Sequence, residues 1–293
     1  MAANGSAMPL ASSYIEQIRA VYPQLEIHSS ELLIDGGQFS IVLFINEALV
    51  FRFPRSEAVA QSMARELVIL AVLQGHTTLP IPRPIYQHTV DGLPAFMGYP
   101  LIPGELVQAN TFASADDAVL KRVAAQIVGF LREVHGTPLD TLDLPQDETR
   151  DDWAAIYREF RDRLYPFMRA DAQAQVTATF EAALNNAELW DYQPMLRHGD
   201  FGTRNILYDP QTLAITGVID FGMSGIGDPA QDVGAISSLG ERFMKHFFAL
   251  YPEMLTTVER VKFIRSTYAL QQALYALRDG NQADFDDGIQ QYI

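Results

Sequence analysis

The sequence predicts an α+β protein built in two parts, because strand-like and helix-like segments occupy different stretches of the chain. Runs rich in β-branched and aromatic residues lie in the first hundred residues. Helical spacing of apolar residues dominates the rest. An apolar run at 95–105 is interrupted by Pro100 and by Pro103-Gly104. This run is the best candidate for the boundary between the two parts.

The composition of the chain limits the kinds of molecule that we expect it to bind. The chain has 293 residues and a net charge of −15, from 21 basic and 36 acidic residues, and it has no cysteine. We therefore expect no nucleic-acid or membrane partner, because a polyanionic surface is bound through a basic patch. A cationic ligand would be attracted, although acidity also serves solubility alone. Without a leader-like start or an apolar run of about 18 residues, we expect a cytoplasmic protein.

The first elements are a helix and a hairpin. A short amphipathic helix is predicted over 13–20, and two strands over 31–46 are joined by a loop at 36–40. The Gly36-Gly37 pair permits a tight reversal. Backbone N–H groups of such a loop can bind phosphates, and a plain hairpin is the alternative.

The next strand, 48–55, carries a cation opposite an aromatic face. Alternation places Phe51 and Phe53 on one face and Arg52 on the other. Such a strand can direct a positive charge into a cleft. An arginine on a solvated face is the alternative.

A helix follows from the N-cap Ser56 to Gly75. Glu66 lies at the edge of its apolar stripe, where an unpaired carboxylate would be costly to bury. Arg52 on the preceding strand is a plausible partner, and a solvated Glu66 is the alternative. The stripe itself consists of Val59, Met63, Leu67 and Leu70.

Beyond a proline-rich connector at 79–87 and an Asp91-Gly92 turn, the run at 95–105 could leave backbone groups free to pair with a purine edge. A simple turn into the next helix is the alternative. Helical patterns then prevail, and His135 in the last turn of the first of them suits the helix dipole. The predicted helices cover 115–136, 151–169, 172–188, 233–250 and 256–278.

Polar residues that suit phosphate chemistry gather at 197–234. Asp200 follows a short strand, Asn205 follows it by five residues, and Asp220 ends a third strand. Phosphoryl transfer needs a group that orients and deprotonates the acceptor hydroxyl, and Mg²⁺ held by oxygen ligands. Asp200 fits the first role, and Asn205 and Asp220 fit the second. A Ca²⁺ site or a plain turn is the alternative; a metallohydrolase is disfavoured because this region holds a single histidine.

These residues resemble a known family. His198-Gly199-Asp200-x4-Asn205 resembles the catalytic loop of the aminoglycoside phosphotransferase family, the kinase-like small-molecule and antibiotic kinases. Ile219-Asp220-Phe221-Gly222 is similar to its metal-binding segment. The motif Gly227-Asp228-Pro229-x2-Asp232 is also typical of antibiotic kinases. The resemblance implies that His198 and Asp232 support the catalytic loop.

The family implies a two-lobed protein-kinase-like fold. Residues 1–98 would form a nucleotide-binding lobe with a mainly antiparallel, five-stranded sheet and one helix. Residues 99–104 would be the hinge, where the Pro100 carbonyl and the Ile102 N–H read the purine. Residues 105–293 would form a helical lobe with the catalytic loop and the acceptor pocket.

The resemblance also assigns the phosphate contacts. The loop with Gly37 and Ser40 would cover the nucleotide phosphates, and Arg52, held by Glu66, would contact the α- and β-phosphates. Arginine keeps the charge of the lysine found in protein kinases and offers phosphate a planar fork. This change could affect the choice of nucleotide.

Within the family, FRFPR, the Glu66 helix and GYPLIPGE are most similar to the aminoglycoside 2″-phosphotransferases, several of which accept GTP as well as ATP. Acidic residues such as Glu241 and Asp279 could line a pocket for a polycation. Solvated helix ends are the alternative for these two residues.

The sequence thus predicts a monomeric enzyme that uses Mg²⁺ and moves the γ-phosphoryl group of ATP or GTP to a small-molecule hydroxyl. An aminoglycoside is the favoured acceptor, with antibiotic resistance as the implied role; a macrolide, an amino alcohol or homoserine is the alternative. A nucleotide-binding pseudokinase is the alternative of another class. It is disfavoured because Asp200, Asn205 and Asp220 are all present.

Overall fold

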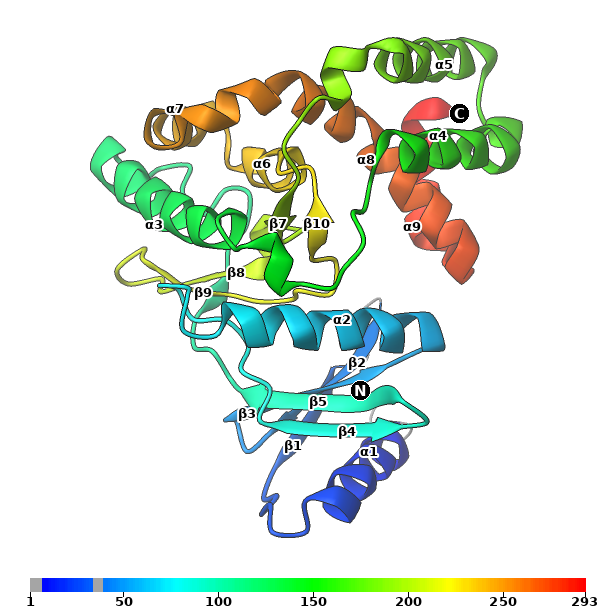
Figure 1. The fold of residues 1–293 in the computed structure, drawn as a ribbon. Coiled ribbons are helices and arrows are strands. Elements are labelled where there is room, and N and C mark those ends of the chain that lie inside the picture. The colour runs from blue at the N-terminus through cyan, green and yellow to red at the C-terminus, as the bar shows by residue number, and fades with distance from the viewer. Residues whose placement is uncertain (1–6, 34–38) are drawn as a thin grey trace. The chain divides into compact units, whose positions relative to one another are not determined.

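The computed structural model describes residues 7–33 and 39–293. The predicted α+β class is confirmed, because one unit of the chain carries an antiparallel sheet and the other is mainly helical (Figure 1). The segment with the candidate metal ligands, 204–224, groups with the sheet, although the residues on both sides of it in the sequence belong to the other unit. Unit 1 comprises Met1–Val107 with Arg204–Ser224, and unit 2 comprises Gln108–Thr203 with Gly225–Ile293.

A five-stranded sheet with the strand order β1-β2-β3-β5-β4 dominates unit 1, and all its neighbours are antiparallel. The strand β4 lies where the sequence predicted the end of a surface connector. It was missed because it is short and carries only two half-buried side chains, Tyr86 and His88. The strands are β1 (Ser30–Leu33), β2 (Ser40–Ile45), β3 (Leu49–Pro54), β4 (Tyr86–Val90) and β5 (Leu93–Pro100).

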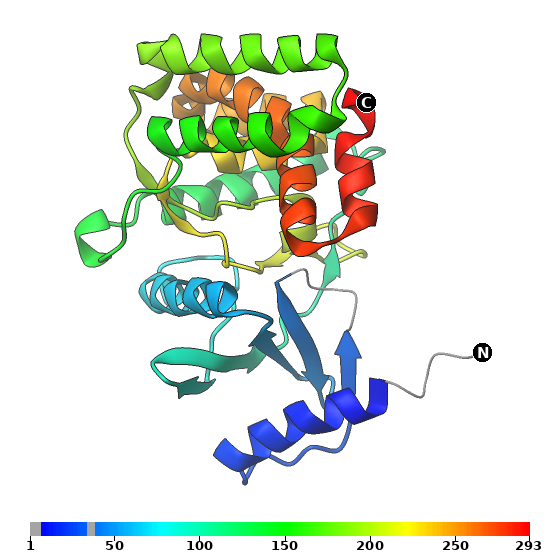
Figure 2. The same cartoon turned by 90° about the vertical axis from the view of Figure 1, so that its right-hand side faces the viewer.

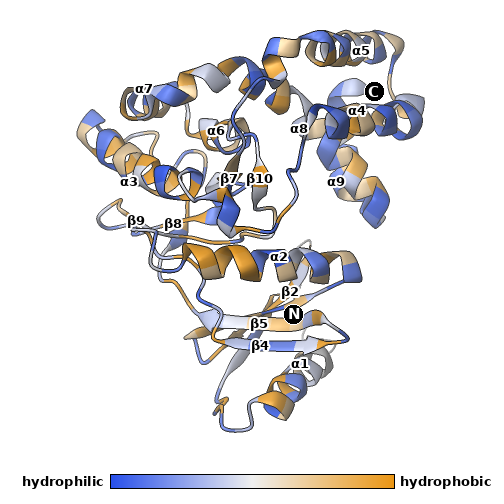
Figure 3. Cartoon of the chain, viewed as in Figure 1, coloured by the Kyte–Doolittle hydropathy of each residue, from blue (hydrophilic) through white to orange (hydrophobic). Residues whose placement is uncertain are grey.

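Two helices cover opposite faces of this sheet (Figure 1). The helix α1 (Ala7–Val21), longer than predicted, packs through Ile18 on the face of Phe51 and Phe53. The helix α2 (Glu57–Leu73) starts at the predicted N-cap Ser56, and its apolar positions concentrate in its C-terminal half (Figure 3). It packs on the face that also carries Arg52, so the alternation predicted for β3 is confirmed.

A smaller sheet completes unit 1, with the order β6-β8-β9. Its edge strand β6 (Glu105–Leu106) follows β5 only after a break, and β8 (Ile206–Tyr208) and β9 (Ile215–Val218) flank a turn. This small sheet packs closely against the segment around Ile102. A Cβ atom at Gly217 would lie 2.6 Å from the Ile102 side chain, so this position has room only for glycine.

Unit 2 is built from helices that differ from the predicted ones at three points, one of which is an additional helix at Gln282–Ile289. After α4 the backbone passes through a π-helical turn and a 3₁₀ turn, so the predicted helix 151–169 is shorter. The predicted helix 233–250 is interrupted because Gly240 adopts φ +89°. The helices are α3 (Asp117–His135), α4 (Arg150–Glu159), α5 (Ala170–Asn185), α6 (Ala230–Ile236), α7 (Glu241–Leu250), α8 (Val258–Asp279) and α9 (Gln282–Ile289).

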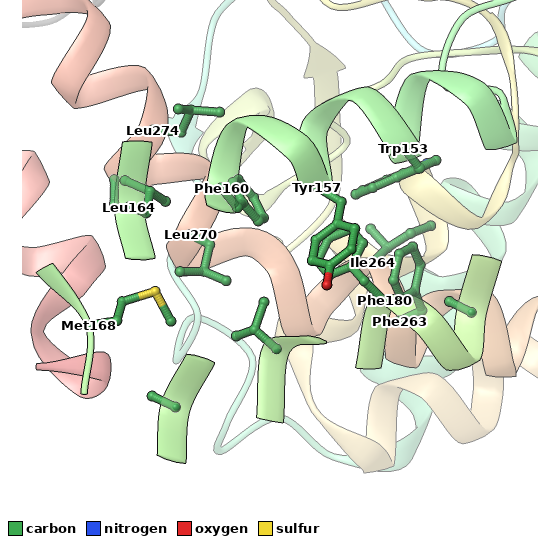
Figure 4. Close-up of a cluster of buried hydrophobic side chains, with 14 of the residues drawn as sticks. Trp153, Tyr157, Phe160, Leu164, Met168, Phe180, Phe263, Ile264, Leu270 and Leu274 are labelled. Carbon is green, nitrogen blue, oxygen red and sulfur yellow. The ribbon is translucent and has the colours of Figure 1, made fainter. Parts of the chain in front are cut away.

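An aromatic cluster forms much of the unit 2 core (Figure 4). Phe180 of α5 stacks on Tyr157 of α4 with ring centroids 4.8 Å apart, and it meets Phe263 of α8 edge-on. The helices α4 and α5, which carry these two stacked rings, run side by side (Figure 2). Truncating one such ring costs about 3–5 kcal/mol. Within 7–33 and 39–293, no helix combines the length and apolar character of a membrane span.

Candidate active site

Arg52 is the centre of a buried charge cluster in unit 1. Its Nη1 donates to Glu66 Oε1 at 2.7 Å, and its Nη2 donates to Asp220 Oδ1 at 3.0 Å. The Arg52 and Glu66 side chains are 10% and 1% exposed, whereas that of Asp220 is 45% exposed. The ion pair predicted between Arg52 and Glu66 is therefore present. The guanidinium fork also reaches a second carboxylate that is open to a ligand.

The helix α2 holds the segment after β9 at two points. The Phe221 N–H donates to Glu66 Oε1 at 3.2 Å, and the Ser62 hydroxyl donates to the Gly222 carbonyl. Immediately before these anchors, Asp220 adopts φ +62°. A positive φ is costly for a residue with a side chain and persists only where the surroundings enforce it. The contacts thus hold Asp220 in a conformation that its own backbone does not favour.

Burial and the neighbouring charges shift the pKa values in this cluster in opposite directions. Burial tends to lower the pKa of Arg52, but the carboxylates of Glu66 and Asp220 outweigh it, and the net shift is upward. Burial raises the pKa of Glu66 against the opposing effect of Arg52. Tyr99 of β5 was not predicted as part of the cluster; burial raises its pKa to about 12, and Arg52 opposes this shift. The cluster therefore keeps a permanent cation beside a half-exposed carboxylate.

Asn205 and Asp220 offer an oxygen donor set. The Ile219 N–H donates to the Asn205 carbonyl at 2.9 Å, so the backbone joins the two candidate metal ligands within unit 1. No group of three His, Cys, Asp or Glu residues in the described part of the chain could hold a metal alone. Mg²⁺ commonly uses one or two protein oxygens together with substrate phosphates and water. One carboxylate and one amide therefore fit Mg²⁺ bound with a nucleotide.

The other residues predicted to contact the nucleotide lie in different structural settings. Gly37 lies outside the described residues. Ser40 is buried at the start of β2, and its hydroxyl makes no hydrogen bond to a described residue. Pro100 ends β5, and the Leu101 N–H donates to the Ala48 carbonyl at 2.8 Å. The Ile102 N–H has no such bond within the described chain, which suits its predicted role.

The candidate catalytic loop in unit 2 follows β7 (Met195–Arg197), which pairs with β10 (Gly225–Gly227). The His198 N–H donates to Asp232 Oδ2 at 3.0 Å, and the Gly199 N–H donates to Asp232 Oδ1 at 2.8 Å. The side chain of Asp232 is completely buried. The contacts expected of a brace are therefore present, and they leave the following Asp200 exposed.

A residue that the sequence assigned only to the helix dipole takes part in this brace. His135 is buried, with its Nε2 3.1 Å from Asp232 Oδ2. Burial alone would raise the pKa of Asp232, but its hydrogen bonds with His135 and with the His198 backbone lower it. The available signal was helical spacing: His135 lies four residues beyond Leu131, on the predicted apolar face.

Further buried ion pairs support the loop, and sequence reasoning missed them. Arg197 lies 3.2 Å from Glu148, a residue with φ +58° whose carboxylate also accepts a hydrogen bond from Gln231. Arg260 of α8 pairs with Asp228 of the Gly-Asp-Pro motif at 2.7 Å. The Gly-Asp-Pro motif is thus anchored to α8 by a buried ion pair.

The proposed acceptor residues stand apart from this network. Glu241 is the first residue of α7 and Asp279 is the last of α8, and both side chains are exposed. The described geometry does not join either of them to the braced loop. Their role stays a prediction.

The chain is similar to known proteins in both sequence and fold. The family model described as "Phosphotransferase enzyme family" (APH) matches residues 32–263. The viomycin phosphotransferase of Streptomyces vinaceus is 30% identical over 270 residues, which cover 89% of this chain and 92% of that protein. A solved structure, the GDP and kanamycin complex of APH(2″)-IIia, superposes with a TM-score of 0.88 at 25% identity, over 95% of this chain and 96% of that one.

A second solved structure, the GDP complex of a wild-type aminoglycoside 2′-phosphotransferase-IIIa, gives a TM-score of 0.86 at 25% identity and covers 96% of both chains. The match of the family model spans most of the sequence, including Arg52, the catalytic loop and Asp232. The fold is the kinase-like one that the resemblance implied. The chain therefore belongs to the APH phosphotransferase enzyme family.

Proposed function

We propose that the protein transfers the γ-phosphoryl group of ATP or GTP to a hydroxyl group of a small cationic antibiotic, with an aminoglycoside as the first candidate. The observation that carries this proposal is the buried Arg52, held between Glu66 and the half-exposed Asp220. Phosphoryl transfer depends on a fixed cation and metal-binding oxygens at the nucleotide phosphates. This cluster supplies both.

In the proposed reaction, unit 1 binds the nucleotide. Arg52 contacts its phosphates with the fork that Glu66 orients, and the backbone at Pro100 and Ile102 pairs with the purine. Asn205 and Asp220 would hold Mg²⁺, which when bound neutralises negative charge on the phosphates. Ser40 is proposed to lie near the phosphates.

Asp200 acts on the acceptor. Its carboxylate accepts a hydrogen bond from the acceptor hydroxyl and then the proton, as the hydroxyl oxygen bonds to the γ-phosphorus. The bond between that phosphorus and the bridging oxygen breaks, which leaves a phosphorylated acceptor and a nucleoside diphosphate. His198 and Asp232 fix the backbone from which Asp200 projects.

The acceptor class rests on charge and similarity. A net charge of −15 attracts a cationic ligand, and one similar structure is described as a kanamycin complex. Glu241 and Asp279 stay candidates for contacts to its amino groups. Viomycin is a second candidate acceptor, because the viomycin phosphotransferase matches over nearly its whole length. We also propose that the enzyme acts as a cytoplasmic monomer.

The deciding experiment is a transfer assay with γ-labelled ATP and, separately, GTP. Kanamycin, viomycin, a macrolide, choline and homoserine serve as acceptors, and Asp200→Ala serves as the control enzyme. We expect label on kanamycin or viomycin with the wild type only. Label on the macrolide, choline or homoserine alone would replace the acceptor class. Nucleotide binding without transfer to any of them would favour the pseudokinase alternative.

A further inference from the structure

A buried chain of polar contacts runs from the catalytic loop of unit 2 into α3. Asp232 Oδ2 meets both the His198 N–H and His135 Nε2, and His135 Nδ1 lies 3.1 Å from the Tyr251 hydroxyl. The side chains of His135 and Asp232 are almost completely buried. Each contact therefore forms where little water can replace it.

The available hydrogen-bond donors and acceptors determine which group donates in each of these contacts. Asp232 accepts from two backbone N–H groups and has a lowered pKa, so it is an ionised carboxylate that can only accept. His135 must then carry its hydrogen on Nε2 and donate it to Asp232. In the neutral ring Nδ1 is left as an acceptor, and the Tyr251 hydroxyl donates to it. Tyr251 thus selects the tautomer that Asp232 requires.

The outer end of the chain is anchored as well. The Arg132 guanidinium lies over the Tyr251 ring, 4.4 Å from its centroid, and pairs with Glu253 at 2.9 Å. Arg132 is on α3, one turn before His135. The same helix therefore holds the ring of Tyr251 and presents the imidazole that the Tyr251 hydroxyl orients.

We propose that His135 is a positioning residue of the catalytic loop. Its Nε2–H holds the Asp232 carboxylate in the orientation in which one oxygen receives the His198 N–H and the other receives the Gly199 N–H. Gly199, at φ +84°, sets the direction of the backbone into Asp200. The effect on turnover rests on the proposed function, whereas the effect on the loop does not.

The test compares His135→Phe, which removes the donor, with His135→Gln, whose amide can still donate to Asp232. We expect His135→Phe to lower the kcat of transfer by about 10- to 100-fold, as losses of orienting partners do, and His135→Gln to recover most of it. The Kd for the nucleotide should stay the same, because the groups proposed to bind it lie in unit 1. His246→Phe is the control, since its ring lies 3.8 Å from the exposed Asp117 and, among the described residues, no contact to the His135–Asp232 chain is recorded for it.

Two measurements decide the proposal without turnover. Amide hydrogen exchange at His198 and Gly199 should accelerate in His135→Phe and return towards the wild-type rate in His135→Gln. The nitrogen NMR spectrum of the wild type should show a hydrogen on Nε2 of His135. Unchanged exchange in a folded His135→Phe protein, or an Nε2 atom without a hydrogen, would overturn the positioning role. A wild type that transfers to no acceptor but shows both signatures would overturn the proposed function alone.

Discussion

The candidate functional residues of unit 1 and those of unit 2 are held by different forces. In unit 1, opposite charges hold side chains: Arg52 lies between Glu66 and Asp220. In unit 2, one buried carboxylate, Asp232, holds backbone N–H groups. A side-chain cluster can adjust to a ligand that arrives with its own charges. A braced backbone instead keeps one exposed group, Asp200, in a constant position.

This contrast predicts which quantity each substitution changes. Substitutions in the charge cluster should alter the affinity for the nucleotide and the stability of unit 1. Substitutions in the braced loop should alter turnover while nucleotide affinity stays near that of the wild type. A variant that changes nucleotide affinity and turnover equally would contradict this division of roles between the two units.

Asp200→Ala should have the largest effect. Loss of the proposed base lowers kcat by about 10²- to 10⁴-fold, and the Kd for the magnesium nucleotide, measured by calorimetry, should remain close to the wild-type value. Asp200→Asn is the matched variant, because it keeps the shape of the side chain and removes its proton affinity. Substantial turnover in either protein would remove Asp200 from the chemical step.

Arg52→Ala comes next, with an effect on stability. It leaves Glu66 buried with a hydrogen bond from Phe221 but without its cation, and losing one partner of a buried pair costs about 3–5 kcal/mol. Denaturant unfolding measures this loss. Arg83→Ala, at an exposed arginine of unit 1, is the control and should lie within about 0.5 kcal/mol of the wild type. Equal free energies of unfolding for the two variants would show that the ion pairs of Arg52 do not stabilise unit 1.

These two predictions concern residues that sequence reasoning could find, because their signals are local. Strand alternation separated Arg52 from Phe51 and Phe53, and helical spacing placed Glu66 at the edge of a buried stripe. The motif spacing located Asp200, and the predicted strand ends located Asp220. The element types followed from the same short-range patterns.

The missed features depend on contacts distant in sequence. His135 meets Asp232 across 97 residues, and helical spacing on α3 can place His135 on the buried face but cannot identify its partner. The pair Glu148–Arg197 depends on a positive φ in a loop. The strand β4 became a strand only because β5 offered it a partner, which overrode its weak local signal.

Asp220→Ala should have a moderate effect, restricted to the metal-dependent part of binding. With Mg²⁺ present, nucleotide affinity should fall by about 10- to 100-fold, a loss of about 1.4–2.7 kcal/mol. With the metal chelated, wild type and variant should bind the nucleotide alike. Calorimetry under both conditions separates a ligand of the metal from a partner of Arg52. An equal loss in both conditions would assign Asp220 to the ion pair alone.

Tyr99→Phe should have the smallest effect at neutral pH, and it tests how dry the charge cluster is. Burial raises the pKa of Tyr99 to about 12, above the ordinary value of about 10. The folded protein therefore keeps this proton at a pH at which the unfolded chain releases it, and stability falls as the pH rises from about 10 to about 12. At pH 7 the variant should lose only about 1 kcal/mol, the worth of one hydrogen bond. Above pH 10 its unfolding free energy should decline less steeply than that of the wild type, since it lacks the group whose titration is suppressed. Parallel alkaline curves for the two proteins would mean that solvent reaches Tyr99, and that the cation of unit 1 is less enclosed than its contacts with Glu66 and Asp220 indicate.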